Sequence, residues 1–379
     1  MAIDPPGDGL VGLAPIAPRA ALGLMPNEQH QTYHGFMRGA PGAPQPAYCL
    51  AIVEFDDQGR CYDRGQMDAV AGVMTQLMHD EADVILLVFV HGWKHDARTD
   101  DEDLSEFRRV LMRVGLHERN TAAGRARPVM GIFIGWRGMS EYGVGDIVAD
   151  STFWGRQAAA QRVATGSVRE LFGRLRHYRN HRLTRDRSGS PLLVIAGHSF
   201  GGMIVYSALS QSLIEAASAP GGLLTPSFAD LVLLVNPAIE GARYLPIYDL
   251  VKGAAFRARN IPQPPVFICA QAENDQPVGT FFPIGNFTRR LDQATIGDLE
   301  KACTTHAIGF IPEFRTHRLT GSSEGASFRL DPPGERQENP YWVVGADKAV
   351  INNHSGIWQQ PFQDFLADIL LEHVEASRR

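Results

Sequence analysis

The chain has 379 residues, of which 44% are apolar and 21% are charged. This composition is typical of a soluble globular protein and excludes a chain that is disordered throughout. The net charge of −6 provides no overall attraction to nucleic acid or to an anionic membrane, so we expect neither as a partner.

The cysteines and the apolar runs indicate the compartment. The four cysteines lie far apart and form no CxxC pair, so they predict reduced thiols rather than a disulfide framework or a zinc site: Cys49, Cys61, Cys269 and Cys303. Prolines and charged residues interrupt the first 24 residues, so we expect no secretory leader there. No stretch has the length of a membrane span. We therefore expect a cytoplasmic protein.

The expected elements follow a proline- and glycine-rich arm over residues 1–46. Strands are predicted at 48–55, 84–90, 129–134, 192–196, 231–235, 266–270 and 341–344, with 60–62 as an antiparallel hairpin partner of the first. Helices are predicted at 67–77, 104–116, 158–178, 202–217 and 362–373. The strands are apolar on both faces and alternate with helices, which predicts one α/β domain over 47–379 with a mostly parallel central sheet covered on both faces.

Two segments fall outside this alternation, residues 240–265 and the long insertion 276–340 before the last strand. Irregular segments of this length are often caps or lids over a binding site. Their aromatic side chains, among them Tyr244, Phe281 and Phe282, either roof a substrate pocket or anchor the insertions to the body of the domain.

Residues 197–201 read GHSFG, directly after the apolar run 192–196 and directly before the helix predicted at 202–217. A short pattern alone is weak evidence, but here it lies on a strand, a sharp turn and a helix. A serine exposed on such a turn needs small neighbours, and Gly197 and Gly201 provide them. The start of the helix also brings backbone N–H groups to the serine.

This arrangement resembles the nucleophile elbow of the α/β-hydrolase family, and the resemblance covers most of the chain from Tyr48 onward. It implies that Ser199 is a catalytic nucleophile and that no cofactor or metal is required. His91-Gly92-Trp93, after the strand 84–90, resembles the oxyanion loop of the family. The resemblance implies that the backbone N–H groups of Trp93 and Phe200 bind the oxyanion, while His91 orients the loop.

The family order of serine, acid and histidine also directs the choice of the other catalytic residues. Asp275 lies in the loop after the strand 266–270 and resembles the family's acid, with Glu273 and Glu240 as alternatives. His354 lies between the last predicted strand and the closing helix, where the family has its histidine. The alternatives His306 and His317 lie within the long insertion.

Other polar and aromatic residues near strand ends have plainer explanations. Trp136 and Met139 follow the strand 129–134 and either line the pocket or pack beneath a loop. His91 and His95 follow a strand and have no evident third metal ligand, and Asp96 has the plainer role of capping the next helix, so we expect no metal site. An arginine-rich stretch near residues 174–187 is interpreted mainly as a solvated helix face, with an anionic partner as the alternative.

Together these features predict a serine hydrolase that cleaves carboxylic esters through an acyl-enzyme, with a small-molecule ester as its substrate. Two alternatives stay open. The same residues serve amidases, thioesterases, lipases and acyltransferases, and a non-catalytic binding protein with this fold is a further class. The sequence does not indicate the acyl-chain preference or the oligomeric state.

Overall fold

In a computed structural model the chain forms two compact units. The N-terminal unit comprises Met1–Ile195 and Leu370–Arg379, and the C-terminal unit comprises Ala196–Ile369. The structure describes residues 48–79, 83–93, 95–98, 100–122, 126–136, 147–183, 191–218, 228–253, 256, 263–276, 278–279, 297–322, 327–331 and 339–377. The expected arm over 1–46 lies outside these residues, and the expected single domain over 47–379 stays a prediction.

The N-terminal unit is built on parallel strands. β1 (Cys49–Phe55), β3 (Val129–Trp136) and β2 (Ile85–Val90) pair in the order β1-β3-β2. All residues of these strands are buried, as the apolar pattern on both faces predicts. β4 (Leu192–His198) begins in this unit, where the Leu192 N–H donates to the Val84 carbonyl (3.1 Å), and ends in the other.

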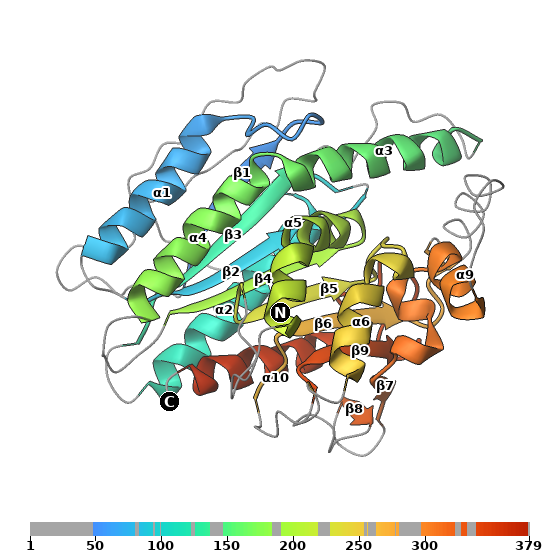
Figure 1. The fold of residues 1–379 in the computed structure, drawn as a ribbon. Helices are drawn as coiled ribbons and strands as arrows, with labels where there is room; N and C mark the ends of the chain where they lie inside the picture. Colours follow the sequence, from blue (N-terminus) through green and yellow to red (C-terminus); the bar gives the residue numbers. More distant parts are fainter. Residues whose placement is uncertain are drawn as a thin grey trace. The chain divides into compact units, whose positions relative to one another are not determined.

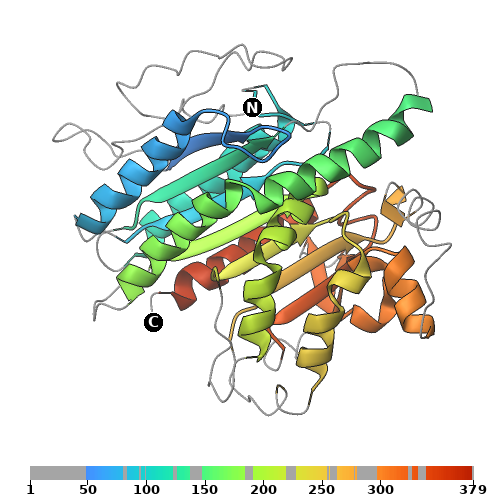
Figure 2. The same ribbon diagram turned by 45° about the horizontal axis from the view of Figure 1, so that its top comes forward.

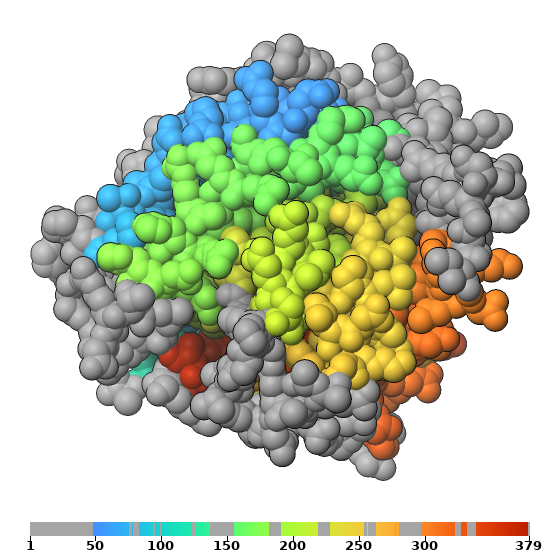
Figure 3. Space-filling model, viewed as in Figure 1, coloured from blue at the N-terminus to red at the C-terminus, as the bar shows by residue number. Residues whose placement is uncertain are grey.

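Helices cover both faces of these strands. α1 (Arg64–His79) and α4 (Val168–Leu183) pack together on one face, and α2 (Glu102–Thr121) lies against the other (Figures 1 and 2). α2 begins where the sequence favours a helix, because the Asp101 carboxylate caps the Leu104 N–H (3.3 Å). α4 lies at the surface of the unit (Figure 3), and its Arg174 pairs with Glu170 (2.6 Å), which suits a solvated face.

One expectation for the N-terminal unit was wrong and one is present in reduced form. The helix predicted at 158–178 is two helices, α3 (Ile147–Thr165) and α4, because the chain turns at Gly166. A Cβ on Gly166 would lie 2.1 Å from the Gly59 carbonyl oxygen, so the turn is pressed against a second glycine. The antiparallel return predicted at 60–62 is present as a single bridge between Phe55 and Cys61, with the Tyr62 N–H donating to the Glu54 carbonyl (2.7 Å), while β1 pairs with β3 in parallel.

Among its described residues, the C-terminal unit contains the end of β4 and five further strands. These are β5 (Leu231–Val235), β6 (Phe267–Ala272), β7 (His317–Gly321), β8 (Phe328–Asp331) and β9 (Tyr341–Ala346), in the order β4-β5-β6-β9-β7-β8. β5, β6, β9 and β7 pair in parallel, and β8 is antiparallel to β7. β7 and β8 belong to the segment 276–340, which was expected to lie outside the sheet. Both strands are short and partly exposed, so they lack the continuous apolar runs from which the other strands were predicted.

The helices of the C-terminal unit also lie on both faces. α5 (Phe200–Ser218) and α6 (Leu245–Lys252) cover one face, and the first part of α10 (Gln360–Ala376) lies behind the strands (Figure 2). α9 (Asp298–Thr305) and the short helices η1 (Gly241–Arg243), η3 (Ile308–Phe310) and η4 (Pro312–Phe314) occupy the expected insertions.

The described residues therefore have an α/β architecture with mostly parallel strands. None of the helices described is long and apolar enough to cross a membrane.

Candidate active site

Ser199 lies on the turn between β4 and α5, in a backbone conformation that side chains rarely adopt. Its φ is 55°, in the left-handed region that costs a non-glycine residue energy. The turn is fixed from both sides, because the Ser199 N–H donates to the Val235 carbonyl (3.0 Å) and the Ser199 carbonyl accepts from the Met203 N–H (3.1 Å). The serine side chain is thus presented in one orientation at the end of the strand.

The glycine before the turn is sterically required. A Cβ on Gly197 would lie 2.6 Å from the backbone carbon and oxygen of Gly201, a separation that real Cβ atoms essentially never show. The backbone at Gly202 is also close to a neighbour, because a Cβ there would lie 3.0 Å from Pro237. The tight strand-to-helix turn expected from GHSFG is therefore present, and its tightness comes from backbone packed on backbone.

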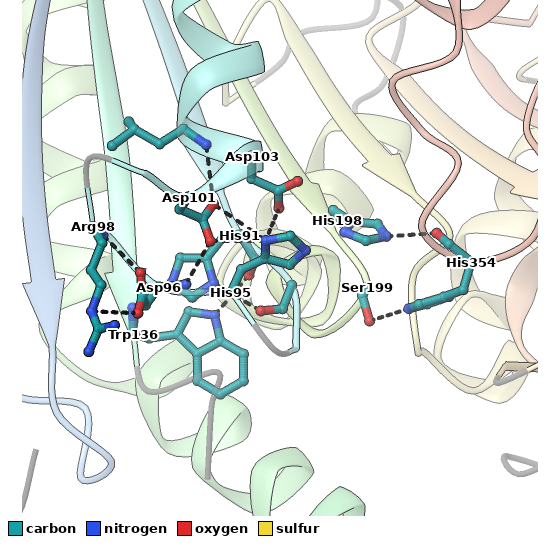
Figure 4. Close-up of polar contacts among 12 residues, drawn as sticks. His91, His95, Asp96, Arg98, Asp101, Asp103, Trp136, His198, Ser199 and His354 are labelled. Atoms are coloured by element: carbon teal, nitrogen blue, oxygen red, sulfur yellow. Dashed lines mark hydrogen bonds and ion pairs between the residues drawn. The ribbon is translucent and has the colours of Figure 1, made fainter. Parts of the chain in front are cut away.

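Ser199, His354 and Asp275 form a continuous chain of hydrogen bonds in the C-terminal unit. The Ser199 Oγ lies 2.7 Å from the His354 Nε2, and the His354 Nδ1 lies 2.8 Å from the Asp275 Oδ2 (the serine and histidine are shown in Figure 4). A carboxylate can only accept, so Nδ1 bears the proton and Nε2 accepts from the serine hydroxyl. The imidazole is thereby held in the tautomer that can remove the serine proton.

The Asp275 carboxylate is fully buried but not isolated. Its Oδ1 accepts from the Val278 N–H (3.1 Å), and its Oδ2 accepts from the Gln271 Nε2 (2.8 Å) in addition to His354. These three donors replace the water that the buried carboxylate lacks and fix its orientation.

Asparagine side chains join the loop of Asp275 to the loop of His354. The Asn274 Nδ2 donates to the Asn352 Oδ1 (3.0 Å), and the Asn353 N–H donates to the Asn274 Oδ1 (2.9 Å). Asn353 itself adopts a φ of 63°, which asparagine tolerates better than most residues. The distance between acid and base is therefore set by direct links between their loops.

Two further residues, which sequence reasoning did not link to the candidate site, hold the backbone of His354. The His354 carbonyl accepts from the His198 Nε2 (3.0 Å; Figure 4) and from the Asn236 Nδ2 (2.8 Å). His198 is the second residue of the GHSFG motif. Asn236 follows β5 with a φ of 45°, and a polar residue directly after a buried strand was the available signal.

The two alternative acids, Glu273 and Glu240, make contacts outside the hydrogen-bonded chain of Ser199, His354 and Asp275. Glu273 forms ion pairs with Arg318 (3.0 Å) and Arg315 (3.6 Å), which direct its carboxylate away from an acid role. The backbone of Glu240 forms an isolated antiparallel bridge with Ala307.

The two alternative histidines are likewise placed elsewhere. The His306 Nδ1 lies 2.9 Å from the Thr305 Oγ1 at the exposed end of α9. His317 is buried in β7 with its ring 4.3 Å from that of Trp342. The imidazole that contacts the Ser199 hydroxyl is that of His354.

In the N-terminal unit, His91 organises the end of β2 rather than offering a base. It is fully buried, its Nδ1 donates to the Gly92 carbonyl (2.9 Å), and its Nε2 accepts from the Trp136 N–H (3.1 Å; Figure 4). Burial lowers the pKa of His91 to about 4, because desolvation disfavours the charged ring. The ring is thus neutral at pH 7, with both nitrogens bound to backbone groups.

The expected oxyanion and pocket residues are placed as follows. Trp93 is half-buried after β2, whereas Phe200 begins α5 in the other unit, so their joint role stays a prediction. Trp136 is buried, and its indole N–H donates to the His91 carbonyl (2.8 Å). The Tyr244 ring packs against Phe267 with centroids 5.7 Å apart. Their pocket roles stay predictions, and the other pocket candidates lie outside the described residues: Met139, Phe281 and Phe282.

One group of described side chains has the spacing of metal ligands. Donor atoms of His95, Asp101 and Asp103 lie within 4.8 Å of one another in the N-terminal unit. Burial opposes the charged form of His95, but its hydrogen bond to Asp101 (3.1 Å) and the charge of Asp103 outweigh burial and raise the pKa of His95. Since Asp101 also caps α2, an ion pair that braces this loop accounts for the group.

No protein-family model, curated protein or solved structure matches the chain. Functional interpretation therefore rests on the chemistry of the residues themselves.

Proposed function

We propose that the protein is a serine hydrolase that cleaves carboxylic esters through an acyl-enzyme. One observation supports this most strongly: the hydroxyl of Ser199, the imidazole of His354 and the carboxylate of Asp275 are joined by hydrogen bonds of 2.7 and 2.8 Å. This is the set of contacts by which a base activates a serine and an acid orients the base.

In the proposed reaction His354 first acts as a base and then as an acid. Its Nε2 takes the Ser199 proton as the Oγ attacks the acyl carbon, and the Asp275 carboxylate stabilises the imidazolium that forms. The imidazolium then donates its proton to the departing alcohol oxygen, which leaves an ester of Ser199. A water molecule, deprotonated by His354, attacks this ester and releases the carboxylic acid.

We also propose that the chain adopts the α/β-hydrolase fold. Support comes from the positions of the three residues, since Ser199 follows β4, Asp275 follows β6 and His354 follows β9, in the chain order of that fold. Within the C-terminal unit, the backbone N–H of Phe200 is a proposed oxyanion donor.

Covalent labelling tests the proposal. A fluorophosphonate probe reacts with an activated serine, so the wild-type protein should be labelled and Ser199→Ala should not. Ser207→Ala is a matched control, because Ser207 lies on α5 just beyond the turn and has no place in the mechanism. A wild-type protein that stays unlabelled over the range pH 6 to 9 would refute the enzyme and favour the binding-protein alternative.

Labelling does not distinguish esters from other acyl compounds. Hydrolysis rates on matched ester, thioester and amide series with a common acyl group make that distinction. We expect the esters to give the largest kcat/KM. If the amides are cleaved as fast as the esters, an amidase is the better description.

A further inference from the structure

Gln271, a residue of β6, is fully buried beside the acid of the candidate triad. Its Nε2 donates to the Asp275 Oδ2 (2.8 Å) and lies 3.3 Å from the Asn236 Oδ1. Both neighbours are acceptors, so the amide orientation follows from the contacts and the nitrogen must face them. The oxygen of Asp275 that binds His354 therefore also receives a hydrogen bond from Gln271.

Asn236 extends this contact to the base. Its Oδ1 accepts from the Ala272 N–H (2.8 Å) as well as from Gln271, and its Nδ2 donates to the His354 carbonyl (2.8 Å). The two amides thus connect the acid, through its side chain, with the base, through its backbone. Both are fully buried, so water does not compete for these bonds.

The amide oxygen of Gln271 differs from its amide nitrogen in its contacts. Among the described residues its Oε1 is buried without a hydrogen-bond partner. A Cβ on Gly309 would lie 2.2 Å from the Gln271 Cβ, so the backbone of η3 covers the side chain closely. A buried acceptor without a partner lowers stability relative to an apolar side chain of the same shape. The stability of the fold alone therefore does not favour glutamine here.

We propose that Gln271 is a positioning residue that sets the orientation and the charge of the Asp275 carboxylate, with Asn236 holding the loop of His354. This inference rests on the proposed function. The donor from Gln271 withdraws part of the negative charge that Asp275 presents to His354. Without it, the carboxylate stabilises the imidazolium more strongly and keeps only two of its three donors, the Val278 N–H and the His354 Nδ1, so its orientation is less firmly set.

The test is Gln271→Met, which keeps the length of the side chain and removes the donor and the unpartnered oxygen. The rate constant for fluorophosphonate labelling is measured from pH 5 to 9, and unfolding by urea is measured at pH 7.5. We expect the rate to fall by about 10-fold. We expect the acid limb of the pH–rate profile to move to higher pH by about half a unit, because the base keeps its proton longer. The urea midpoint should stay equal or rise.

Gln66→Met is the matched control. Gln66 is also fully buried and also contacts a carboxylate, since its Nε2 donates to the Glu54 Oε2 (3.1 Å) and its Oε1 accepts from the Glu54 N–H (2.9 Å). Both ends of this amide are satisfied and it belongs to the N-terminal unit. We expect its replacement to lower the urea midpoint and to leave the acid limb in place.

The outcomes separate the two proposals. An unlabelled wild-type protein refutes the proposed function itself. A labelled wild type with an acid limb unmoved in Gln271→Met overturns only the role of Gln271.

If Gln271→Met does not fold, Gln271→Glu replaces it in the same measurement. Its carboxyl can donate to Asp275 only while protonated, so labelling should decline as the pH rises. A profile of wild-type shape overturns the inference, and so does failure of both variants to fold, because a purely structural role would then explain the residue.

Discussion

Two histidines that follow parallel strands show that the hydrogen-bond partners of an imidazole determine whether it can transfer a proton. His91, directly after β2 in the N-terminal unit, is fully buried and both its nitrogens are bound to backbone groups. His354, after β9 in the C-terminal unit, has a side chain that is 14% exposed and contacts the hydroxyl of Ser199 and the carboxylate of Asp275. Backbone partners fix one protonation state, whereas a hydroxyl and a carboxylate allow a proton to move. Position after a strand alone therefore does not identify a base.

The largest expected difference between replacing His354 and replacing His91 is in the reactivity of Ser199. His354→Ala removes the base and should lower the rate of ester hydrolysis by about 10⁴-fold or more. In His91→Gln, folded protein should keep a rate within about tenfold of wild type, since the ring has no part in proton transfer. Both rates are measured on a p-nitrophenyl ester. Equal losses of hydrolysis rate in the two variants would contradict the different roles of His354 and His91.

The acid partner should have the next largest effect. Asp275→Asn keeps the shape of the side chain but favours the wrong imidazole tautomer, so we expect a loss of about 10³- to 10⁴-fold in kcat/KM. Glu273→Gln and Glu240→Gln are the matched controls and should change kcat/KM little. If Glu240→Gln alone abolishes activity, our assignment of the acid is wrong.

The pH dependence of stability tests the buried ring. Folding holds the pKa of His91 at about 4, below its ordinary value of 6.5. The unfolded chain therefore takes up a proton first as the pH falls. The contribution of His91 to the free energy of unfolding is complete above pH 6.5 and is lost toward pH 4, by about 3 kcal/mol in all.

Urea unfolding of the wild type and of His91→Gln at pH 7.5 and 4.5 measures this contribution. The wild type should lose more stability between the two pH values than the variant does. Parallel losses would mean that the ring is not held neutral in the folded protein.

The smallest effect concerns Trp136, which supports His91 from β3. Trp136→Phe removes the indole N–H that donates to the His91 carbonyl and should lower the free energy of unfolding by about 1 kcal/mol. Urea unfolding and ester hydrolysis are measured together. A large change in KM without a change in stability would instead place Trp136 in the substrate pocket, as the sequence also allowed.

The fully buried strands and the position of Ser199 were predictable because both depend on local pattern. Buried parallel strands are continuous apolar runs, so 231–235 agrees with β5, and polar residues directly after such runs point to one edge of a sheet. Ser199 was found in this way, whereas Asp275 and His354 were chosen from the residue order that the resemblance to the α/β-hydrolase family implies.

The contacts around these residues were not predictable in the same way. Gln271 lies inside a buried strand, where a single polar residue gives no sign of the partner it will meet. Asn236 is polar after a strand but forms no known motif. β7 and β8 are short and half exposed, so their pattern resembled a loop.

Gly59 and Gly166 illustrate a different kind of constraint. Each would place a Cβ against the backbone of the other segment, 2.3 Å from the Arg162 carbonyl oxygen for Gly59 and 2.1 Å from the Gly59 carbonyl oxygen for Gly166. The Ser167 N–H also donates to the Gly59 carbonyl (2.7 Å). No single substitution at either position can be accommodated without moving the other segment. In a saturation mutagenesis library these two turn positions should therefore be as intolerant as core residues, and second-site suppressors of one should map to the segment that contains the other.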